Sequence, residues 1–258
     1  MDTRFNLVVT IMAAGDGKRM NSIVPKVLHI FGEKPILLRI IETARELDPR
    51  QIMVITSPKN YDFVVETLRQ YTHIRDITFV IQERPLGTGD AIRSCLPWFS
   101  ESDAVLILNG DMPLISKDIL AGFLEGAGKI IAGRIIAAKF ANPTGYGRMI
   151  IDPITESLTG IIEEKDCSDI QRQIQIVNSG IYLFSGLVLK EFVPKIANNN
   201  AQKEYYLTDI VRAIHSEADI NVNIGVHLID ESLNKYISGV NTREELMELE
   251  RFLPLESL

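Results

Sequence analysis

Apolar residues in the first half of the chain follow two alternating patterns. Short continuous apolar runs, which are typical of buried strands, alternate with longer stretches in which apolar residues recur at helical spacing. The expected strands are Leu7–Met12, Gln51–Thr56, Ile77–Ile81 and Ala104–Leu108, and the expected helices are Pro35–Leu47, Tyr61–Tyr71, Thr88–Leu96 and Ser116–Glu125, with Ser116 as cap. We therefore predict a doubly wound, mostly parallel α/β sheet covered on both faces, with ligands at the carboxyl ends of its strands.

The second half of the chain mixes the same patterns less regularly. Its expected strands are Ile130–Lys139, Ile174–Phe184 and Ile220–Leu228, and its expected helices are Gly186–Ile196, Glu204–Glu217 and Thr242–Phe252, with a turn-rich loop at Pro143–Arg148. No internal repeat, linker or low-complexity tract interrupts residues 1–258. We predict one domain, in which the later strands form a smaller β-rich lobe over the edge of the sheet.

Charge and composition narrow the possible functions. The net charge of −7 argues against nucleic acid or an anionic membrane surface as a partner. Neither Cys95 nor Cys167 belongs to a C-x-x-C pair or lies beside a histidine cluster, and the four histidines have no ligand spacing, so neither a disulfide framework nor a zinc site is indicated. No apolar run is long enough to span a bilayer, and Leu7–Ala14 is a poor signal-peptide core. We expect a cytoplasmic protein.

The loop after the first expected strand has the composition of an anion-binding turn. Gly15 and Gly17 allow backbone amides to approach a ligand closely, and Lys18, Arg19 and Lys26 add positive charge. These features suit a triphosphate, although an ordinary strand-to-helix turn with surface lysines remains an alternative.

Two familiar phosphate-binding motifs are excluded at this loop. A P-loop requires glycine at the position of Met12, and a Ser or Thr after its lysine, whereas Lys18 is followed by Arg19. A dinucleotide fingerprint requires a third glycine where Met20 stands.

Polar residues also follow the third and fourth expected strands. Gln82 carries a donor and an acceptor in one plane, which matches the edge of a uracil, and a polar loop that opens a helix with Thr88 as its cap is a compatible interpretation. Asp111 is a good magnesium ligand at the end of its strand, because Mg²⁺ prefers oxygen ligands and takes few of them from protein. The alternative for Asp111 is a turn residue before Pro113.

Several ordered motifs carry a resemblance to a known family. They are Ala13-Ala14-Gly15-x-Gly17-x-Arg19-Met20, Pro25-Lys26-Val27-Leu28-His29, Leu86-Gly87-Thr88-Gly89, Gly110-Asp111-x-Pro113-Leu114, Pro143-Thr144-Gly145-Tyr146-Gly147-Arg148, Asn198-Asn199-Asn200-Ala201-Gln202, Glu204-Tyr205-Tyr206-x-Thr208-Asp209 and Gly239-Val240-Asn241. The chain resembles the sugar-nucleotide pyrophosphorylases, and most closely the uridylyltransferase domain of the bacterial bifunctional enzymes that make UDP-N-acetylglucosamine. The resemblance implies a Rossmann-like nucleotide-diphospho-sugar transferase fold.

The resemblance also implies a reaction and a site. UTP and N-acetylglucosamine 1-phosphate would give UDP-N-acetylglucosamine and pyrophosphate, with nucleotide binding in about residues 1–115 and sugar binding in about residues 116–258. Arg19, Lys26 and Asp111 would be catalytic, and Asp111 and Asn241 would bind Mg²⁺. The implied substrate contacts are Met12, Ala13, Ala14, Gly15, Lys26, Gln82, Gly87, Thr88, Asn109, Gly110, Asp111, Gly147, Glu163, Asn178 and Asn241.

The chemistry that the resemblance implies does not require a general base. The attacking phosphate has a second pKa of about 6 and is already ionised at neutral pH. The obstacle is the repulsion between two anions, which a metal ion and basic side chains reduce.

For Asn241 considered alone, capping of the helix that follows is the simpler interpretation.

Three residues depart from the family pattern. Lys18 stands where the bacterial enzymes usually have Thr, Asn109 replaces an aromatic or small residue, and Glu164 replaces a His. The β-helix that carries acetyltransferase activity in the bacterial enzymes has no counterpart in these 258 residues, so acetyl transfer is not expected of them. Two alternatives stay open: the same reaction on another sugar, such as glucose 1-phosphate, and a non-catalytic sensor of a nucleotide sugar.

Overall fold

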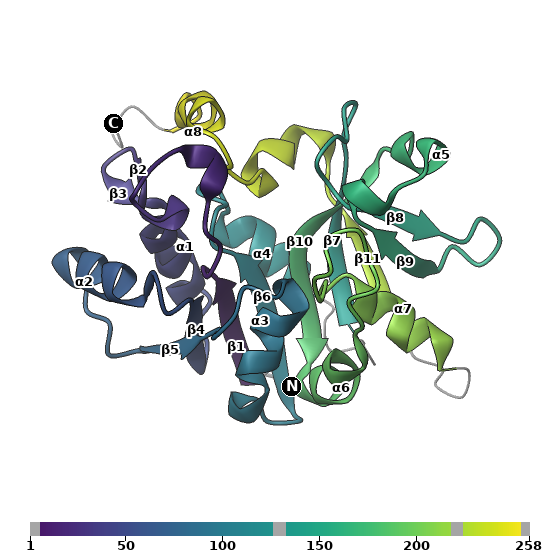
Figure 1. Ribbon diagram of the computed structural model, residues 1–258, viewed down its shortest axis with the longest axis horizontal. Helices are drawn as coiled ribbons and strands as arrows, with labels where there is room; N and C mark the ends of the chain where they lie inside the picture. The colour runs from purple at the N-terminus through teal and green to yellow at the C-terminus, as the bar shows by residue number, and fades with distance from the viewer. Residues whose placement is uncertain (1–5, 126–132, 218–223, 254–258) are drawn as a thin grey trace.

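The computed structural model describes residues 6–125, 133–217 and 224–253, which form a mixed sheet between two layers of helices (Figure 1). The strands of the main sheet are ordered β11-β7-β10-β6-β1-β4-β5. Their bounds are β1 Asn6–Met12, β4 Gln51–Thr56, β5 Ile77–Ile81, β6 Asp103–Asn109, β7 Gly133–Lys139, β10 Ile176–Ser185 and β11 Ile224–Leu228. All neighbouring pairs along this order are parallel except those that β10 makes with β6 and β7. The predicted doubly wound, mostly parallel fold is confirmed.

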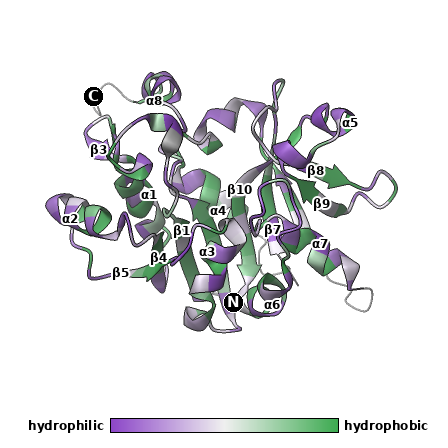
Figure 2. Cartoon of the chain, in the orientation of Figure 1, coloured by the Kyte–Doolittle hydropathy of each residue, from purple (hydrophilic) through white to green (hydrophobic). Residues whose placement is uncertain are grey.

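Helices cover both faces of the sheet because its strands are apolar on both sides. In β1, Leu7, Val9 and Ile11 face one buried cluster, which also contains the apolar side chains of α1, α2, α4 and α8. Val8 faces the other cluster, with the apolar side chains of α3, α6 and α7. The sheet is accordingly the most hydrophobic layer of the molecule in Figure 2, between helices with one polar face. Each fully buried aliphatic side chain contributes about 1.5–3 kcal/mol.

The helices agree closely with the periodicity of the sequence. They are α1 Ile36–Arg45, α2 Tyr61–Tyr71, α3 Thr88–Cys95, α4 Lys117–Leu124, α5 Asp169–Arg172, α6 Gly186–Phe192, α7 Asp209–Ser216 and α8 Arg243–Glu250. Ser116 caps α4 as predicted, with its hydroxyl accepting from the backbone N–H of Ile119. No helix among the described residues is long and apolar enough to cross a membrane.

One predicted helix begins later than its sequence pattern suggested. Residues 204–208 are not helical, and α7 begins only at Asp209. The reason is pairing with the loop after β5: the N–H of Tyr205 donates to the carbonyl of Leu86 (2.7 Å), and the N–H of Gly89 donates to the carbonyl of Tyr205 (2.7 Å). These long-range bonds hold residues 204–206 in a non-helical conformation where local propensity favours a helix, and Leu207 and Thr208 form a turn before α7.

The later strands do not all leave the sheet. β7, β10 and β11 extend the main sheet, and the starts of the predicted strands at 130–132 and 220–223 lie outside the described residues. The smaller lobe is built around β8 (Arg148–Ile151) and β9 (Leu158–Ile162), which the sequence analysis did not identify as strands. They pair with each other, and β8 branches from β10 through Arg148 and Val177. A short hairpin of β2 (Ile30–Phe31) and β3 (Lys34–Pro35) precedes α1.

We expect two glycine-to-alanine substitutions to change stability in opposite directions. An added Cβ at Gly186 would lie 1.9 Å from the backbone oxygen of Ser100, which cannot rotate away, so Gly186→Ala should destabilise the fold by at least about 1–3 kcal/mol. Gly122 in α4 has open space at the same atom, and Gly122→Ala should stabilise by about 0.5–1 kcal/mol through helix propensity. Urea denaturation measures both changes, and effects of the same sign would contradict this packing.

Candidate active site

The site begins where two neighbouring parallel strands end. Met12 and Asn109, the last residues of β1 and β6, are paired in register, so the loops that follow them leave the sheet side by side. The N–H of Gly110 donates to the carbonyl of Met12 (2.9 Å). A Cβ at Gly110 would lie 2.7 Å from that same oxygen, so only glycine permits this close approach. Both loops therefore leave the sheet at its carboxyl edge, which is where the site is predicted.

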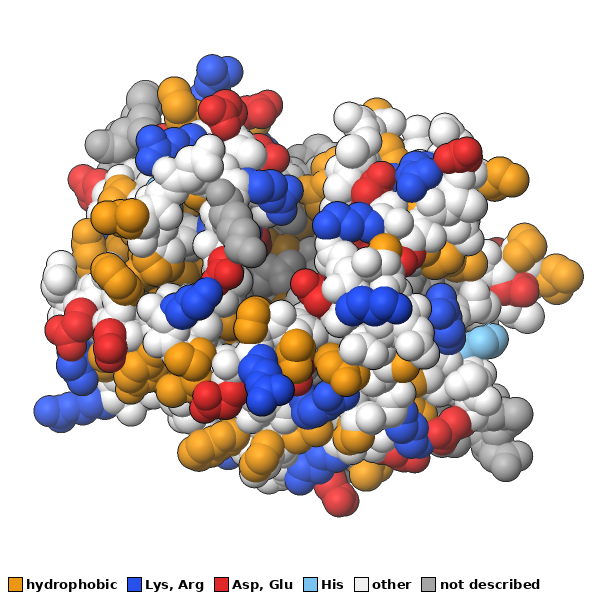
Figure 3. All heavy atoms as spheres, viewed as in Figure 1, with side chains coloured by type: hydrophobic (Ala, Val, Ile, Leu, Met, Phe, Trp, Pro, Cys, Tyr) orange, Lys and Arg blue, Asp and Glu red, His pale blue; other side chains and the backbone are white. Residues whose placement is uncertain are grey.

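A long cleft runs along this edge. Two adjoining cavities of about 790 and 490 Å³ share the residues at their junction, which are Met12, Arg19, Thr88, Asn109, Asp111 and Asn241. Figure 3 shows a hollow between the two upper parts of the molecule, one carrying the first loops of the chain and the other carrying β8, β9 and α5. The smaller cavity is lined by the glycine-rich loop and by the segment after β5. The larger cavity is lined in part by residues of the β8–β9 lobe.

Four charged or amide side chains from distant parts of the sequence converge at the junction of the two cavities. The ammonium group of Lys26 forms an ion pair with Asp111 and also donates to Oδ1 of Asn241 (3.1 Å). The guanidinium of Arg19 donates to the same Asn241 oxygen (2.8 Å). Asn241 lies 215 residues from Lys26 in the sequence, so this cluster is a product of the tertiary structure.

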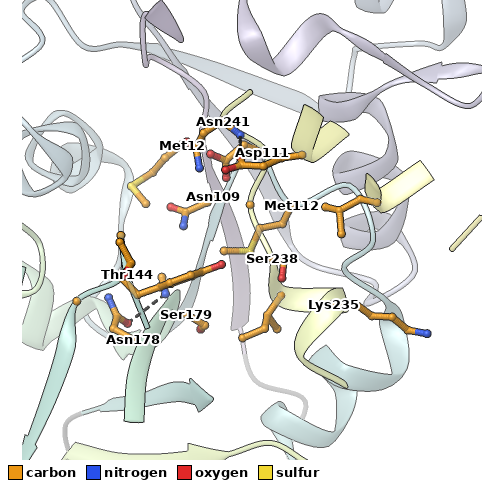
Figure 4. Close-up of a pocket in the computed structure, with 18 of the residues that line it drawn as sticks. Met12, Asn109, Asp111, Met112, Thr144, Asn178, Ser179, Lys235, Ser238 and Asn241 are labelled. Carbon is orange, nitrogen blue, oxygen red and sulfur yellow. Dashed lines mark hydrogen bonds between the residues drawn. The ribbon is translucent and has the colours of Figure 1, made fainter. Parts of the chain in front are cut away.

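Backbone contacts fix the two oxygen-bearing residues relative to each other. The N–H of Val240 donates to the carbonyl of Asp111 (2.8 Å), and the carboxylate of Glu245 accepts from the N–H of Asn241 (2.6 Å). The cap of α8 is Thr242, whose hydroxyl and Glu245 form a reciprocal capping box. The capping interpretation of Asn241 is therefore wrong, and its side chain points into the cleft beside Asp111 (Figure 4).

The side-chain oxygens at the junction fit a magnesium ion. They offer one carboxylate and one amide oxygen, and Mg²⁺ takes its remaining oxygens from phosphates and water. In the part of the chain that the structure describes, no group of three or more His, Cys, Asp or Glu residues could enclose a metal ion by itself. The ammonium group of Lys26, which bonds to both oxygens, shows that the pair attracts a cation.

The predicted nucleotide contacts surround the smaller cavity. The side-chain amide of Gln82 donates to the carbonyl of Gly87 (3.0 Å) and to Asp90 (3.0 Å), which fixes its plane. Gly87 has a φ of 108°, and a Cβ there would lie 2.5 Å from the carbonyl of Tyr205. Thr88 is not a side-chain cap of α3, because its hydroxyl accepts from the N–H of Leu207 (2.9 Å).

The predicted sugar contacts Gly147, Glu163 and Asn178 line the larger cavity. The hydroxyl of Thr208 donates to Glu163 (3.0 Å). Burial raises the pKa of the Glu163 carboxyl, against the lowering effect of that hydrogen bond, and the nearby charge of Asp209 raises it further. Glu163 is thus a partly buried acceptor within the cleft rather than part of a solvated face.

Of the predicted site residues, Ala13 alone lines neither cavity. Its side chain is buried, its N–H donates to Ile55, and its carbonyl accepts from Asn60 (2.8 Å). Both backbone polar groups of Ala13 are thus engaged within the protein, and its buried side chain supports the loop from beneath. The others line one or both cavities, and their individual roles stay predictions.

The structure adds residues to the cleft that the sequence analysis did not single out. Tyr146, Ser179, Tyr182 and Ser238 line the larger cavity. The hydroxyl of Tyr182 accepts from Nδ2 of Asn178 (2.7 Å), although these residues lie in one strand whose register shifts between them. For Ser179 and Tyr182 the signal in the sequence is weak, because polar residues within the apolar strand β10 are visible but their direction is not.

The three residues that depart from the family pattern have different surroundings. Asn109 lines both cavities and packs against Gly180, where an added Cβ would lie 2.2 Å from its Nδ2. Glu164 lies outside the lining of both cavities and binds the buried Arg148 at 2.7 Å. The side chain of Lys18 lies outside what the structure describes.

Comparison with known proteins assigns the chain to a family. The MobA-like NTP transferase domain matches residues 9–173, which is more than half of the chain. The chain belongs to this family. It is therefore a nucleotidyltransferase, and the loops at the ends of β1 and β6 lie within the matched region.

Two similar proteins match nearly the whole length of this chain. A protein of Acanthamoeba polyphaga mimivirus, named a probable UDP-N-acetylglucosamine pyrophosphorylase, is 38% identical over 249 residues, 95% of each chain. The bifunctional protein GlmU of Nitrosococcus oceani is 42% identical over 95% of this chain but only 51% of its own length. The chain thus spans about half the length of the bifunctional relatives that it matches.

A solved structure confirms the fold independently. A putative glucose-1-phosphate thymidylyltransferase from Bacillus anthracis superposes with a TM-score of 0.73 and covers 96% of this chain and 97% of its own. At 19% identity this similarity concerns the fold alone.

We predict that Glu164 stabilises the lobe through its ion pair with Arg148. Partial burial raises the pKa of the Glu164 carboxyl. Hydrogen bonds from Arg148 and from the N–H of Gly145 together lower it by a larger amount, so the net shift is downward. Glu164→Gln leaves a buried guanidinium without its counter-charge and should cost about 2 kcal/mol at neutral pH. Because the folded pKa is lowered, this stabilisation is present above the ordinary glutamate pKa and lost as the pH falls through the lowered value.

Denaturant unfolding between pH 3 and 7, expressed as the difference between wild type and variant, measures this contribution. Asp169→Asn is the matched control, because Asp169 pairs with Arg172 on the same lobe but is fully exposed. A difference that is independent of pH, or equal in both variants, would contradict the assignment.

Proposed function

We propose that the protein joins UTP to N-acetylglucosamine 1-phosphate and releases pyrophosphate, forming UDP-N-acetylglucosamine with the help of Mg²⁺. The observation that carries this proposal is the convergence of Arg19, Lys26, Asp111 and Asn241 at the junction of the two cavities. A nucleotide bound on one side and a sugar phosphate on the other would bring their phosphates together at this junction. We further propose that residues 1–258 act as one domain in the cytoplasm, with the nucleotide half at about 1–115 and the sugar half at about 116–258.

The names of the relatives support the choice of sugar and nucleotide. The mimivirus protein is named for UDP-N-acetylglucosamine, and it matches this chain over 95% of both lengths. The cleft offers hydrogen-bonding groups for sugar hydroxyls and an acetamido group at Glu163 and Asn178. On the other side, Gln82 donates its amide hydrogens to Gly87 and Asp90, which leaves its Oε1 to accept from the N3–H of a uracil.

The residues of the site act mainly by positioning and by charge. The attacking phosphate is already ionised near neutral pH, since its second pKa is about 6, so no side chain has to remove a proton. Lys26 and Arg19 place positive charge where the triphosphate would lie, and the glycine-rich loop offers backbone N–H groups to it. Magnesium bound at Asp111 and Asn241 would supply further charge neutralisation between the two substrates during in-line attack on the α-phosphorus.

The first experiment is a substrate panel. Purified protein is incubated with UTP, Mg²⁺ and one of N-acetylglucosamine, glucose, N-acetylgalactosamine or glucosamine 1-phosphate, and pyrophosphate release is measured with and without EDTA. We expect metal-dependent release that is highest with N-acetylglucosamine 1-phosphate and that falls by at least about two powers of ten in Lys26→Ala. Preference for another sugar would overturn the sugar assignment, and silence from a folded protein that binds UDP-N-acetylglucosamine would indicate a sensor.

We predict that Tyr182 positions Asn178 for the sugar phosphate. The N–H of Gly180 can only donate, so its bond to Asn178 (3.1 Å) identifies the amide oxygen and leaves Nδ2 facing Tyr182. Burial raises the pKa of Tyr182, so its hydroxyl is neutral wherever the enzyme is assayed near neutral pH. Tyr182→Phe should raise the KM for the sugar phosphate about fivefold, on the scale of one hydrogen bond, with little change in the KM for UTP.

Steady-state kinetics with each substrate varied in turn separates this outcome from general damage to the site. Equal changes in both KM values, or a loss confined to kcat, would contradict a positioning role for Tyr182.

A further inference from the structure

Both oxygens assigned to the metal already accept hydrogen bonds from cationic side chains. Lys26 bonds to Asp111 and to Oδ1 of Asn241, and Arg19 bonds to that same Oδ1. The side chains of Lys26 and Asp111 are 14% and 19% exposed, so the pair is largely shielded from water. A divalent cation that entered this site would have to share it with an ammonium and a guanidinium group.

The backbones that carry the two oxygens are held in place by hydrogen bonds, whereas the two cations end long, flexible side chains. Asp111 and Asn241 are held by backbone hydrogen bonds to Val240 and Glu245. The base of Lys26 packs against the glycine-rich loop, where an added Cβ at Gly17 would lie 2.5 Å from its Cβ. Its ammonium group sits at the end of a rotatable four-carbon chain and can leave the oxygens without any movement of the backbone.

We propose that Lys26 and Arg19 act as internal counter-cations that keep a free divalent cation out of the Asp111–Asn241 site in the ligand-free protein. This inference rests on the metal site of the proposed function. Nucleotide phosphates, which carry several negative charges, attract both side chains and release the two oxygens. The metal ion is therefore taken up together with the nucleotide. Lys26 and Arg19, which occupy the two oxygens in the ligand-free protein, then contact phosphate.

The physical basis is that like charges compete for the same oxygens. A neighbouring opposite charge changes the affinity of a carboxylate for a proton by about one to three pKa units, and it opposes a second cation in the same way. Removing the ammonium group leaves Asp111 without its partner, which favours a replacement cation. The coupling is reciprocal, so anything that draws Lys26 away raises the affinity of the site for metal.

The test measures Mn²⁺ binding to protein without nucleotide. Mn²⁺ takes oxygen ligands like those of Mg²⁺, and the electron paramagnetic resonance signal of the free ion gives the bound fraction directly. We expect weak binding to the wild type and binding at least about tenfold tighter to Lys26→Met, with a smaller gain in Arg19→Met. Asp111→Asn in the Lys26→Met background should abolish the gain, which assigns it to this site.

Lys235→Met is the matched control. Lys235 lines the same cleft, but its ammonium group lies over the rings of Tyr236 and Phe252 and points away from Asp111 and Asn241 (Figure 4). Removing its charge should leave Mn²⁺ affinity within about twofold, because distant charges are screened by solvent and salt. Circular dichroism verifies that each variant is folded, and Mn²⁺ should raise the melting temperature of Lys26→Met more than that of the wild type.

Unchanged or weaker Mn²⁺ binding in folded Lys26→Met would overturn the inference, as would an equal gain in Lys235→Met. These outcomes are distinct from failure of the proposed function, because the titration requires no substrate and no turnover. An enzyme that is active in the substrate panel but shows no gain on removal of Lys26 would keep its function and lose this mechanism. A gain in a protein that prefers another sugar would leave the counter-cation mechanism standing.

Discussion

The parallel pairing of β1 with β6 is the constraint on which the site depends. It places Met12 beside Asn109 at one edge of the sheet, so the glycine-rich loop and the Asp111 segment begin next to each other. The bond from Gly110 to the carbonyl of Met12 then draws the two loops together before any side chain is considered. Both strands are buried on both faces, which makes their register costly to change.

The second part of the site is brought to this edge by the end of the chain. The segment before α8 attaches to Asp111 through Val240 and is held by Glu245, so Asn241 arrives beside Asp111 with its side chain directed into the cleft. The backbones of Asp111 and Asn241 are tied in place by these contacts, and their short side chains carry the oxygens, whereas Lys26 and Arg19 reach them with long, flexible side chains. This difference between short acceptors on a held backbone and movable cations suits a site that binds charged ligands.

The smaller lobe supplies the other wall of the cleft. It branches from β10 at Val177, one residue before Asn178, so this residue of the larger cavity stands at the point where the sheet divides. The pair of Arg148 and Glu164 ties the loop at 143–148 to the end of β9. Glu164, which differs from the family pattern, therefore acts within the lobe, while Asn109 faces the cleft itself.

Local patterns in the sequence were sufficient for much of the main sheet and its helices. β4, α2 and β5 have the predicted bounds, and Ser116 caps α4, because periodicity and capping involve neighbouring residues. The motifs that the chain shares with the family identified most of the residues that line the cleft. They also placed Ala13 there, although its backbone groups are used by Ile55 and Asn60, which no local pattern indicates.

Contacts between distant segments decided the rest. Residues 204–206 are not helical because of hydrogen bonds to the loop after β5, and these outweigh the helical pattern of the segment. The hairpin of β8 and β9 forms because β10 offers it an edge. The sequence by itself determined which elements form and which residue types can bind phosphate and metal. Only the tertiary structure decided that Lys26 lies between Asp111 and Asn241, because that contact joins segments 85 and 215 residues apart.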